Sequence, residues 1–135
     1  MKIIIISHGS FAQAALDTAQ MIIGKTEDVY ALGIKPGEKV EVFEEKLEEL
    51  LRKSEKEKTE IFVFSDIFFG TPFNTAVRLM KKYSMYHYAG VSMPLILECV
   101  TSKDNMTCDE LKEHIEEVGK SSFVNVNEFM KKCEE

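Results

Sequence analysis

The stretch "IIIISHGSFAQAAL", residues 3–16, runs four isoleucines directly into a histidine that stands between serine and glycine. An unbroken β-branched run of this kind is typical of a strand that is buried on both faces. Ser10, followed three residues later by Gln13, has the pattern of a capping box, which predicts that a helix begins at once and continues through Ile23. His8 is therefore expected where a buried strand ends and a helix begins.

The rest of the chain alternates strand-like and helix-like segments. Further strands are expected at residues 28–34, 60–65 and 86–91, with a short last strand at residues 122–126. Helices are expected from Pro36 to Leu51, from the N-cap Thr71 to Tyr83, from Pro94 to Val100, and from Asp109 to Val118 with Gly119 as the stop. Such alternation with apolar strands predicts an α/β, doubly wound, mainly parallel four-stranded sheet in the order 2-1-3-4, with helices on both faces.

Length, charge and cysteine content limit the classes of protein that the chain can belong to. Its 135 residues fit one domain, and a net charge of −6 provides no basic field for nucleic acid or for an acidic membrane surface. No apolar stretch approaches the roughly 20 residues of a membrane-spanning helix. Cys99, Cys108 and Cys133 are odd in number and far apart, which is typical of reduced thiols in a cytoplasmic protein.

Two polar segments are expected to meet at one edge of the predicted sheet. "SHGS" (residues 7–10) follows the first strand and "SDIFFGTPFN" (residues 65–74) follows the third. In the order 2-1-3-4 these strands are neighbours, and their carboxyl ends form the switch point where such folds bind ligands. Each segment leads into a helix N-terminus, whose unpaired N–H groups favour an anion. The fold therefore brings His8 and Asp66 to one anion-binding edge.

His8 and Asp66 are chemically suited to act together as a nucleophile and the carboxylate that orients it. A neutral imidazole is a nucleophile near neutral pH, and a carboxylate that accepts the N–H of one ring nitrogen leaves the other lone pair free to attack. Gly70 allows close approach of the backbone, and Thr71 offers a hydroxyl and an N–H to phosphoryl oxygens. The residues alone leave two interpretations open: a phosphoryl-carrying histidine, or a structural histidine beside a turn-forming aspartate.

Three motifs in order resemble the enzyme IIA (EIIA) domain of the mannose/fructose/sorbose family of the bacterial phosphoenolpyruvate-dependent sugar phosphotransferase system (PTS). The first is "IIIISHGSFAQAAL", which is similar to the family's opening strand and phosphorylated histidine. The second is "VFSDIFFGTPFNTA" (residues 63–76), and the third is "AGVSMPLILE" (residues 89–98). The resemblance covers the length of the chain.

This resemblance implies a function, partners and an assembly. It implies a phosphotransferase component in which His8 takes a phosphoryl group from the phosphocarrier HPr and passes it to a IIB component, with Asp66 as the acid and Thr71 beside the phosphate. It implies a cytoplasmic homodimer whose short last strand is antiparallel and, in some relatives, exchanged between subunits. One departure is visible, because Phe69 stands where a second glycine is common. We expect a single EIIA domain over residues 1–135, with no IIB domain fused to it.

Three alternatives have separate sequence requirements. A receiver-like signalling module phosphorylated on Asp66 would need an acidic pair after the first strand, where this chain has Ser-His-Gly. A subunit that feeds dihydroxyacetone kinase would share the first histidine motif, but "TPFN" (residues 71–74) favours the sugar-transport family. A flavin carrier would need a Ser/Thr-rich phosphate loop after the first strand, which the chain lacks.

The remaining conspicuous residues receive simpler interpretations. Phe68 and Phe69 are predicted to form an apolar rim for docking protein partners. His87 and His114 are predicted to lie away from the site, on a strand and on a solvated helix. We expect neither a metal nor a cofactor, because no cluster has metal-ligand spacing and no nucleotide-binding loop is present.

Overall fold

Four parallel strands form the centre of the computed structural model, which describes residues 1–135. The strands are β1 (Lys2–His8), β2 (Val29–Ile34), β3 (Ile61–Ser65) and β4 (Tyr86–Ala89), and their order is β2-β1-β3-β4. The predicted sheet and its order are confirmed. In the register, Ile6 pairs with Ser65 on one side and Leu32 on the other, so β1 and β3 end side by side.

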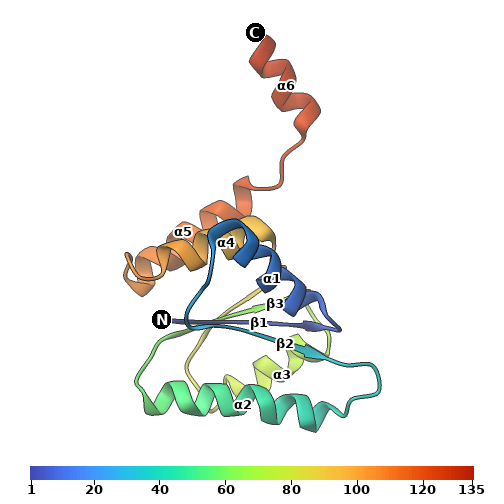
Figure 1. The fold of residues 1–135 in the computed structure, drawn as a ribbon, viewed down its shortest axis with the longest axis vertical. Helices are drawn as coiled ribbons and strands as arrows, with labels where there is room; N and C mark the ends of the chain where they lie inside the picture. The colour runs from blue at the N-terminus through green and yellow to red at the C-terminus, as the bar shows by residue number, and fades with distance from the viewer.

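Helices cover both faces of the sheet, as the sequence predicts. Figure 1 shows α1, α4 and α5 on one face and α2 and α3 on the other. The helices are α1 (Phe11–Ile23), α2 (Val40–Lys56), α3 (Thr71–Leu79), α4 (Met93–Ser102), α5 (Cys108–Ser121) and α6 (Val126–Glu134). None of them combines the length and apolarity that crossing a membrane requires.

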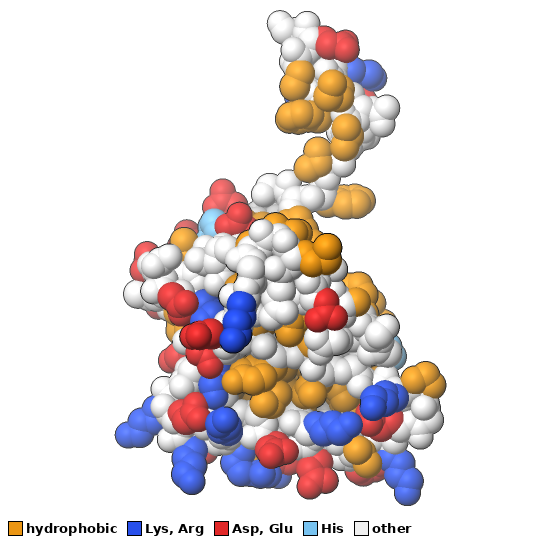
Figure 2. Space-filling model, in the orientation of Figure 1, with side chains coloured by type: hydrophobic (Ala, Val, Ile, Leu, Met, Phe, Trp, Pro, Cys, Tyr) orange, Lys and Arg blue, Asp and Glu red, His pale blue; other side chains and the backbone are white.

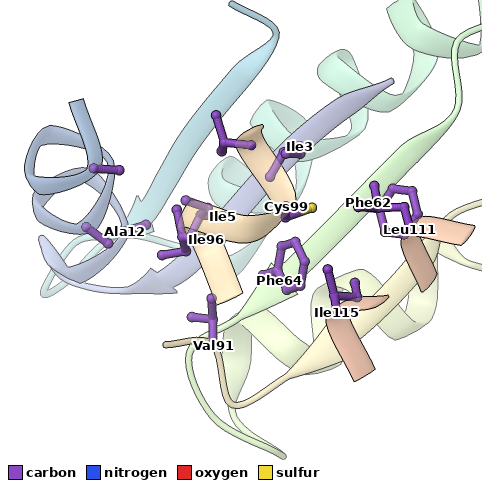
Figure 3. Close-up of a cluster of buried hydrophobic side chains, with 13 residues drawn as sticks. Ile3, Ile5, Ala12, Phe62, Phe64, Val91, Ile96, Cys99, Leu111 and Ile115 are labelled. Carbon is purple, nitrogen blue, oxygen red and sulfur yellow. The ribbon is translucent and has the colours of Figure 1, made fainter. Parts of the chain in front are cut away.

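The alternation of side chains along each strand divides the core into two clusters. On β1, Ile3 and Ile5 face α1, α4 and α5, whereas Ile4 and Ile6 face α2 and α3. Figure 3 shows the first cluster, in which side chains of β1 and β3 meet those of α4 and α5. Since all four isoleucines are fully buried, the run "IIII" is explained by burial on both faces.

Two helix starts differ from the expectation. Ser10 is the N-cap of α1 but its side chain makes no capping bond, so the predicted capping box is wrong. Instead the buried Ser7 Oγ accepts from Ala12 N at 2.8 Å. The N-cap of α3 is Gly70 rather than Thr71, and Pro72 is accordingly the second helical residue. A Ser or Thr near a helix start thus indicates the start without fixing which residue caps it.

The C-terminal part departs furthest from the expectation. Gly119 does not end α5; it lies inside the helix, where an added Cβ would be 3.5 Å from Leu95 Cδ2 on α4. The predicted strand at residues 122–126 is wrong for the single chain: the sheet consists of β1 to β4 alone, and the Asn125 side chain instead accepts from Glu128 N and caps α6. Figures 1 and 2 show α6 projecting away from the domain, with apolar side chains gathered on it.

Candidate functional site

His8 and Asp66 form a bonded pair at the carboxyl ends of β1 and β3. The Asp66 Oδ2 atom lies 2.8 Å from His8 Nδ1 and also accepts from the His8 backbone N–H at 3.0 Å. The pair exists because β1 and β3 are neighbours and Asp66 N donates to Ile6 O, which extends the sheet by one step. The structure therefore brings together the two residues that the sequence predicts as partners.

The electrostatics of the pair favour an ionised carboxylate. Partial burial alone would raise the pKa of Asp66, but hydrogen bonds from the backbone and ring of His8 lower it below its usual value. The second oxygen, Oδ1, accepts from Ile67 N at 3.0 Å. Because both carboxylate oxygens are occupied, Asp66 is held in one orientation and fixes Nδ1 of His8 as the protonated nitrogen.

The remaining ring nitrogen of His8, Nε2, faces the start of α3. A Cβ added to Gly70 would lie 3.0 Å from His8 Cε1 and 3.5 Å from Nε2, so a side chain there would press against the imidazole. Gly70 also has a φ of +135°, which side chains rarely adopt. The imidazole is 49% exposed, so its outward nitrogen is open to a large partner rather than enclosed in a cavity.

The N-terminus of α3 provides the polar groups on this side of the ring. Thr71 is the first residue of α3, directly after Gly70, and Pro72 follows it without an N–H of its own. The first N–H groups of a helix have no partner inside the helix and carry a partial positive charge. Gly70 and the first turn of α3 therefore lie next to the His8 ring.

An aromatic loop borders the site. Phe68 and Phe69 are exposed, their ring centroids lie 4.1 Å apart, and both pack against Phe73 on α3. Phe69 has a φ of +61°, in the left-handed region that favours glycine. This backbone explains why a glycine would be the ordinary residue there. The Phe69 ring contacts those of Phe68 and Phe73 in tilted and edge-to-face geometry.

Three contributors to the site were not predicted from the sequence. Ser7 anchors α1 beside His8, and Gly33 on β2 allows the loop after β1 to pass, because a Cβ there would lie 1.8 Å from Gly9 O. A glycine inside a strand is a signal for such close approach. His87, predicted to lie away from the site, is bonded to Ser65, the residue that precedes Asp66.

Comparison with known proteins identifies the family. A family model described as "PTS system fructose IIA component", of the mannose-type EIIA class, matches residues 2–116. The chain belongs to this family. The chain is 29% identical over 133 residues to the PTS system fructose-specific EIIA component of Bacillus subtilis (strain 168), covering 98% of this chain and 90% of the relative. The predicted resemblance to mannose-type EIIA domains is confirmed.

Further relatives and solved structures agree with this membership. The chain is 34% identical over 122 residues to the PTS system mannose-specific EIIAB component of Escherichia coli (strain K12), covering 89% of this chain and 38% of that longer protein. A crystal structure of the PTS IIA protein associated with the fucose utilization operon from Streptococcus pneumoniae superimposes with a TM-score of 0.84 at 31% identity, covering 96% and 95% of the two chains. The protein is thus a mannose-type EIIA component of a sugar phosphotransferase system.

Proposed function

We propose that this EIIA component carries a phosphoryl group on His8 Nε2, accepting it from phospho-HPr and passing it to a IIB component. The observation that carries the proposal is the 2.8 Å contact between His8 Nδ1 and Asp66 Oδ2 beside Gly70. With Nδ1 protonated and held by the carboxylate, the Nε2 lone pair points to the open side of the site. Family membership supports a phosphotransferase role in general.

The proposed transfer is a displacement at phosphorus. The Nε2 lone pair of His8 forms a new P–N bond as the P–N bond to the donor's phosphorylated histidine breaks, and the donor imidazole leaves with that electron pair. Positive charge that grows on the His8 ring is stabilised by the Asp66 carboxylate. The phosphoryl oxygens face the N-terminus of α3, with Thr71 and the backbone at Gly70. Transfer to the IIB component is the same step in reverse.

The occupied carboxylate also argues against the signalling alternative. An aspartyl phosphate on Asp66 would require one oxygen to leave its hydrogen bonds with His8 or Ile67. The direct test is incubation with phosphoenolpyruvate, enzyme I and HPr, followed by mapping of the modified residue. We expect label on His8 that is lost in acid and kept in alkali. Label on Asp66, or no label at all, would contradict the proposed function.

The aromatic loop is proposed as the docking surface for the protein partners. Phe68 and Phe69 are 65% and 63% exposed and adjoin each other beside His8. Adjoining exposed apolar side chains of this kind are typical of protein interaction sites. Neither loop at the site contains Lys or Arg, so the partner supplies the cationic charge that phosphoryl transfer needs. An apolar centre with a basic partner surface around it fits this acidic chain.

Replacing Phe69 with aspartate is expected to raise KM for phospho-HPr by about 10- to 100-fold, because a charge replaces an apolar contact at the centre of the interface. Folding stability should change little, since the Phe69 ring is exposed and aspartate tolerates a positive φ better than phenylalanine. Steady-state transfer and urea unfolding measure the two effects. The matched control is Met21→Glu, a charge placed on an exposed apolar side chain of α1. Equal KM values for Phe69→Asp and the parent would contradict the docking role.

Besides docking to its protein partners, the chain is proposed to form a homodimer through its C-terminal segment. The side chains of Phe123, Val126, Phe129 and Met130 are exposed, although α6 is amphipathic and would ordinarily cover its apolar face. The outer edge of β4 is unpaired, and a groove of about 550 Å³ runs beside it between Tyr88 and Leu95. A second copy of this chain would cover both surfaces.

The dimer is expected to sediment at twice the chain mass of 15.4 kDa at micromolar concentration. Phe129→Glu combined with Met130→Glu should shift the equilibrium toward monomer by about tenfold or more, because two charges replace buried apolar contacts. Met21→Glu again serves as the control, since Met21 is exposed on α1 outside this surface. A parent chain that sediments as a monomer would contradict the proposal.

A further inference from the structure

His87 connects the edge of the sheet to the aromatic loop beside the site. Its Nε2 lies 3.0 Å from the hydroxyl of Ser65, which is fully buried at the end of β3. Its ring lies 5.2 Å from the ring of Phe73, at an interplanar angle of 37°. The imidazole is therefore anchored on one side by a hydrogen bond to the strand that carries Asp66, and it supports an aromatic side chain on the other.

Phe73 passes this support on to the docking surface. Its ring centroid lies 5.0 Å from that of Phe68 and 5.5 Å from that of Phe69, both in edge-to-face geometry. Four rings thus form a continuous series of aromatic contacts from β4 to the surface next to His8. Among them only His87 has a polar group bonded to the sheet, through Ser65, and it lies at the inner end of this series.

The backbone of the loop needs such support. Phe69 lies in the left-handed region, with a φ of +61°, and Gly70 follows it at a φ of +135° next to the His8 ring. A strained conformation of this kind persists only where neighbouring contacts determine it. The Phe69 ring is mostly exposed, and its ring contacts are with Phe68 and Phe73. Loss of support behind Phe73 is therefore transmitted to Phe69.

We propose that His87 is a positioning residue for phosphoryl transfer, because its ring holds Phe73 and, through it, the Phe68–Phe69 docking surface. This inference rests on the proposed function. Burial lowers the pKa of His87, which agrees with a neutral ring packed against Phe73. The hydrogen bond to Ser65 orients the ring, and the aromatic contact performs the positioning.

The test measures KM and kcat for transfer from phospho-HPr in four variants. His87→Ala is expected to raise KM about fivefold with kcat changed less than twofold, as loss of an aromatic contact implies. His87→Gln keeps a polar group that can bond to Ser65 but no ring, so its KM should be raised similarly. His87→Phe restores a ring against Phe73 and should recover most of the parent KM. The matched control is His114→Ala, which removes a histidine that is bonded to Glu98 away from the site.

A double-mutant cycle separates positioning from a general loss of packing. In a Phe73→Ala background, His87→Ala is expected to have no further effect on KM, because the connecting ring is already gone. Effects on KM that multiply independently would overturn the proposal, as would a KM for His87→Phe as high as that of His87→Ala. A change in kcat alone would overturn it as well.

Two readouts distinguish failure of this inference from failure of the proposed function. Phosphoramidate, a small phosphoryl donor, needs no docking surface, so parent and His87→Ala should be labelled on His8 at equal rates. If neither donor labels the parent, the proposed function is wrong. The amide NMR signals of residues 67–70 test the positioning without any transfer. We expect them to shift in His87→Ala and not in His114→Ala, and unshifted signals in His87→Ala would overturn the inference.

Discussion

Replacing His8 with alanine is expected to abolish phosphoryl uptake from phospho-HPr while the folded structure is kept. The imidazole carries the only proposed nucleophile, so the loss should be complete within the detection limit of the labelling assay. The fold should survive because the side chain is half exposed and the strand remains paired through its backbone. The lost ring contact with Asp66 costs about 1 kcal/mol of unfolding free energy, comparable to one hydrogen bond.

The chain offers a matched control for this experiment. His114 on α5 is also paired with a carboxylate, that of Glu98, at 3.0 Å. His114→Ala removes the same chemical group from a similar ion pair on the helical layer, and it should leave uptake unchanged. Incorporated phosphate is measured and its loss in acid identifies phosphohistidine. Folding is measured by circular dichroism and urea unfolding. Full labelling of His8→Ala would show that the phosphorylated residue is not His8.

The arrangement of the sheet follows from features that the sequence states directly. The runs before His8 and before Asp66 are apolar on both faces, as is typical of a parallel sheet covered on two sides. Once β1 and β3 are neighbours, their carboxyl ends must bring His8 and Asp66 together. The pairing of the two residues is therefore a consequence of topology, and a pattern-level analysis is sufficient to predict it.

The features that the sequence did not predict depend on contacts between distant residues. Nothing local in "IFFG" (residues 67–70) indicates that Phe69 takes a left-handed backbone, and its ring contacts Phe73, which lies on α3 outside this stretch. The bond between His87 and Ser65 likewise requires the register of β3 and β4, where His87 pairs with Val63 two residues before Ser65. Side-chain alternation would place both on one face, but only once that register is known.

The C-terminal segment shows a different limit. "SFVNV" (residues 122–126) has the β-branched and aromatic composition of a strand, but composition does not provide a neighbouring strand. In the single chain the Asn125 side chain caps a helix instead, and Phe123 is 99% exposed. Local capping decided the structure where no tertiary contact was available to override it.

Replacing Asp66 with asparagine is expected to slow phosphoryl uptake by about two to four orders of magnitude, as loss of a histidine's carboxylate partner does in other nucleophilic sites. The reason lies in the hydrogen bonds. Oδ2 of Asp66 accepts from both the backbone N–H and Nδ1 of His8, while Oδ1 accepts from Ile67 N. An amide has one acceptor oxygen and one donor nitrogen, so it cannot accept all three bonds.

Each orientation of the asparagine has a distinct cost. With its nitrogen toward His8, Nδ1 must become the acceptor, which moves the proton to Nε2 and removes the attacking lone pair. The His8 backbone N–H then also faces a donor. With its oxygen toward His8, the tautomer is kept, but the amide nitrogen faces Ile67 N and no negative charge stabilises the imidazolium as the P–N bond forms. Both orientations therefore slow transfer, and both leave one backbone donor unpaired.

Asp109→Asn is the matched control, because it neutralises a carboxylate in the first turn of α5, at the amino-terminal edge of the sheet beside Cys108 and Glu60. It should leave the rate of uptake unchanged.

The dependence of folding stability on pH gives a second readout. Since the pKa of Asp66 is lowered in the folded state, its carboxylate stabilises the fold above the ordinary aspartate pKa of about 3.9, and this contribution is lost as pH falls through the lowered value. In the parent, the free energy of unfolding measured in urea should therefore fall as pH drops from neutral to acidic, and in Asp66→Asn this fall should be smaller. If Asp66→Asn takes up the phosphoryl group at the parent's rate while the pH dependence of its unfolding free energy changes, Asp66 stabilises the loop but takes no part in the transfer.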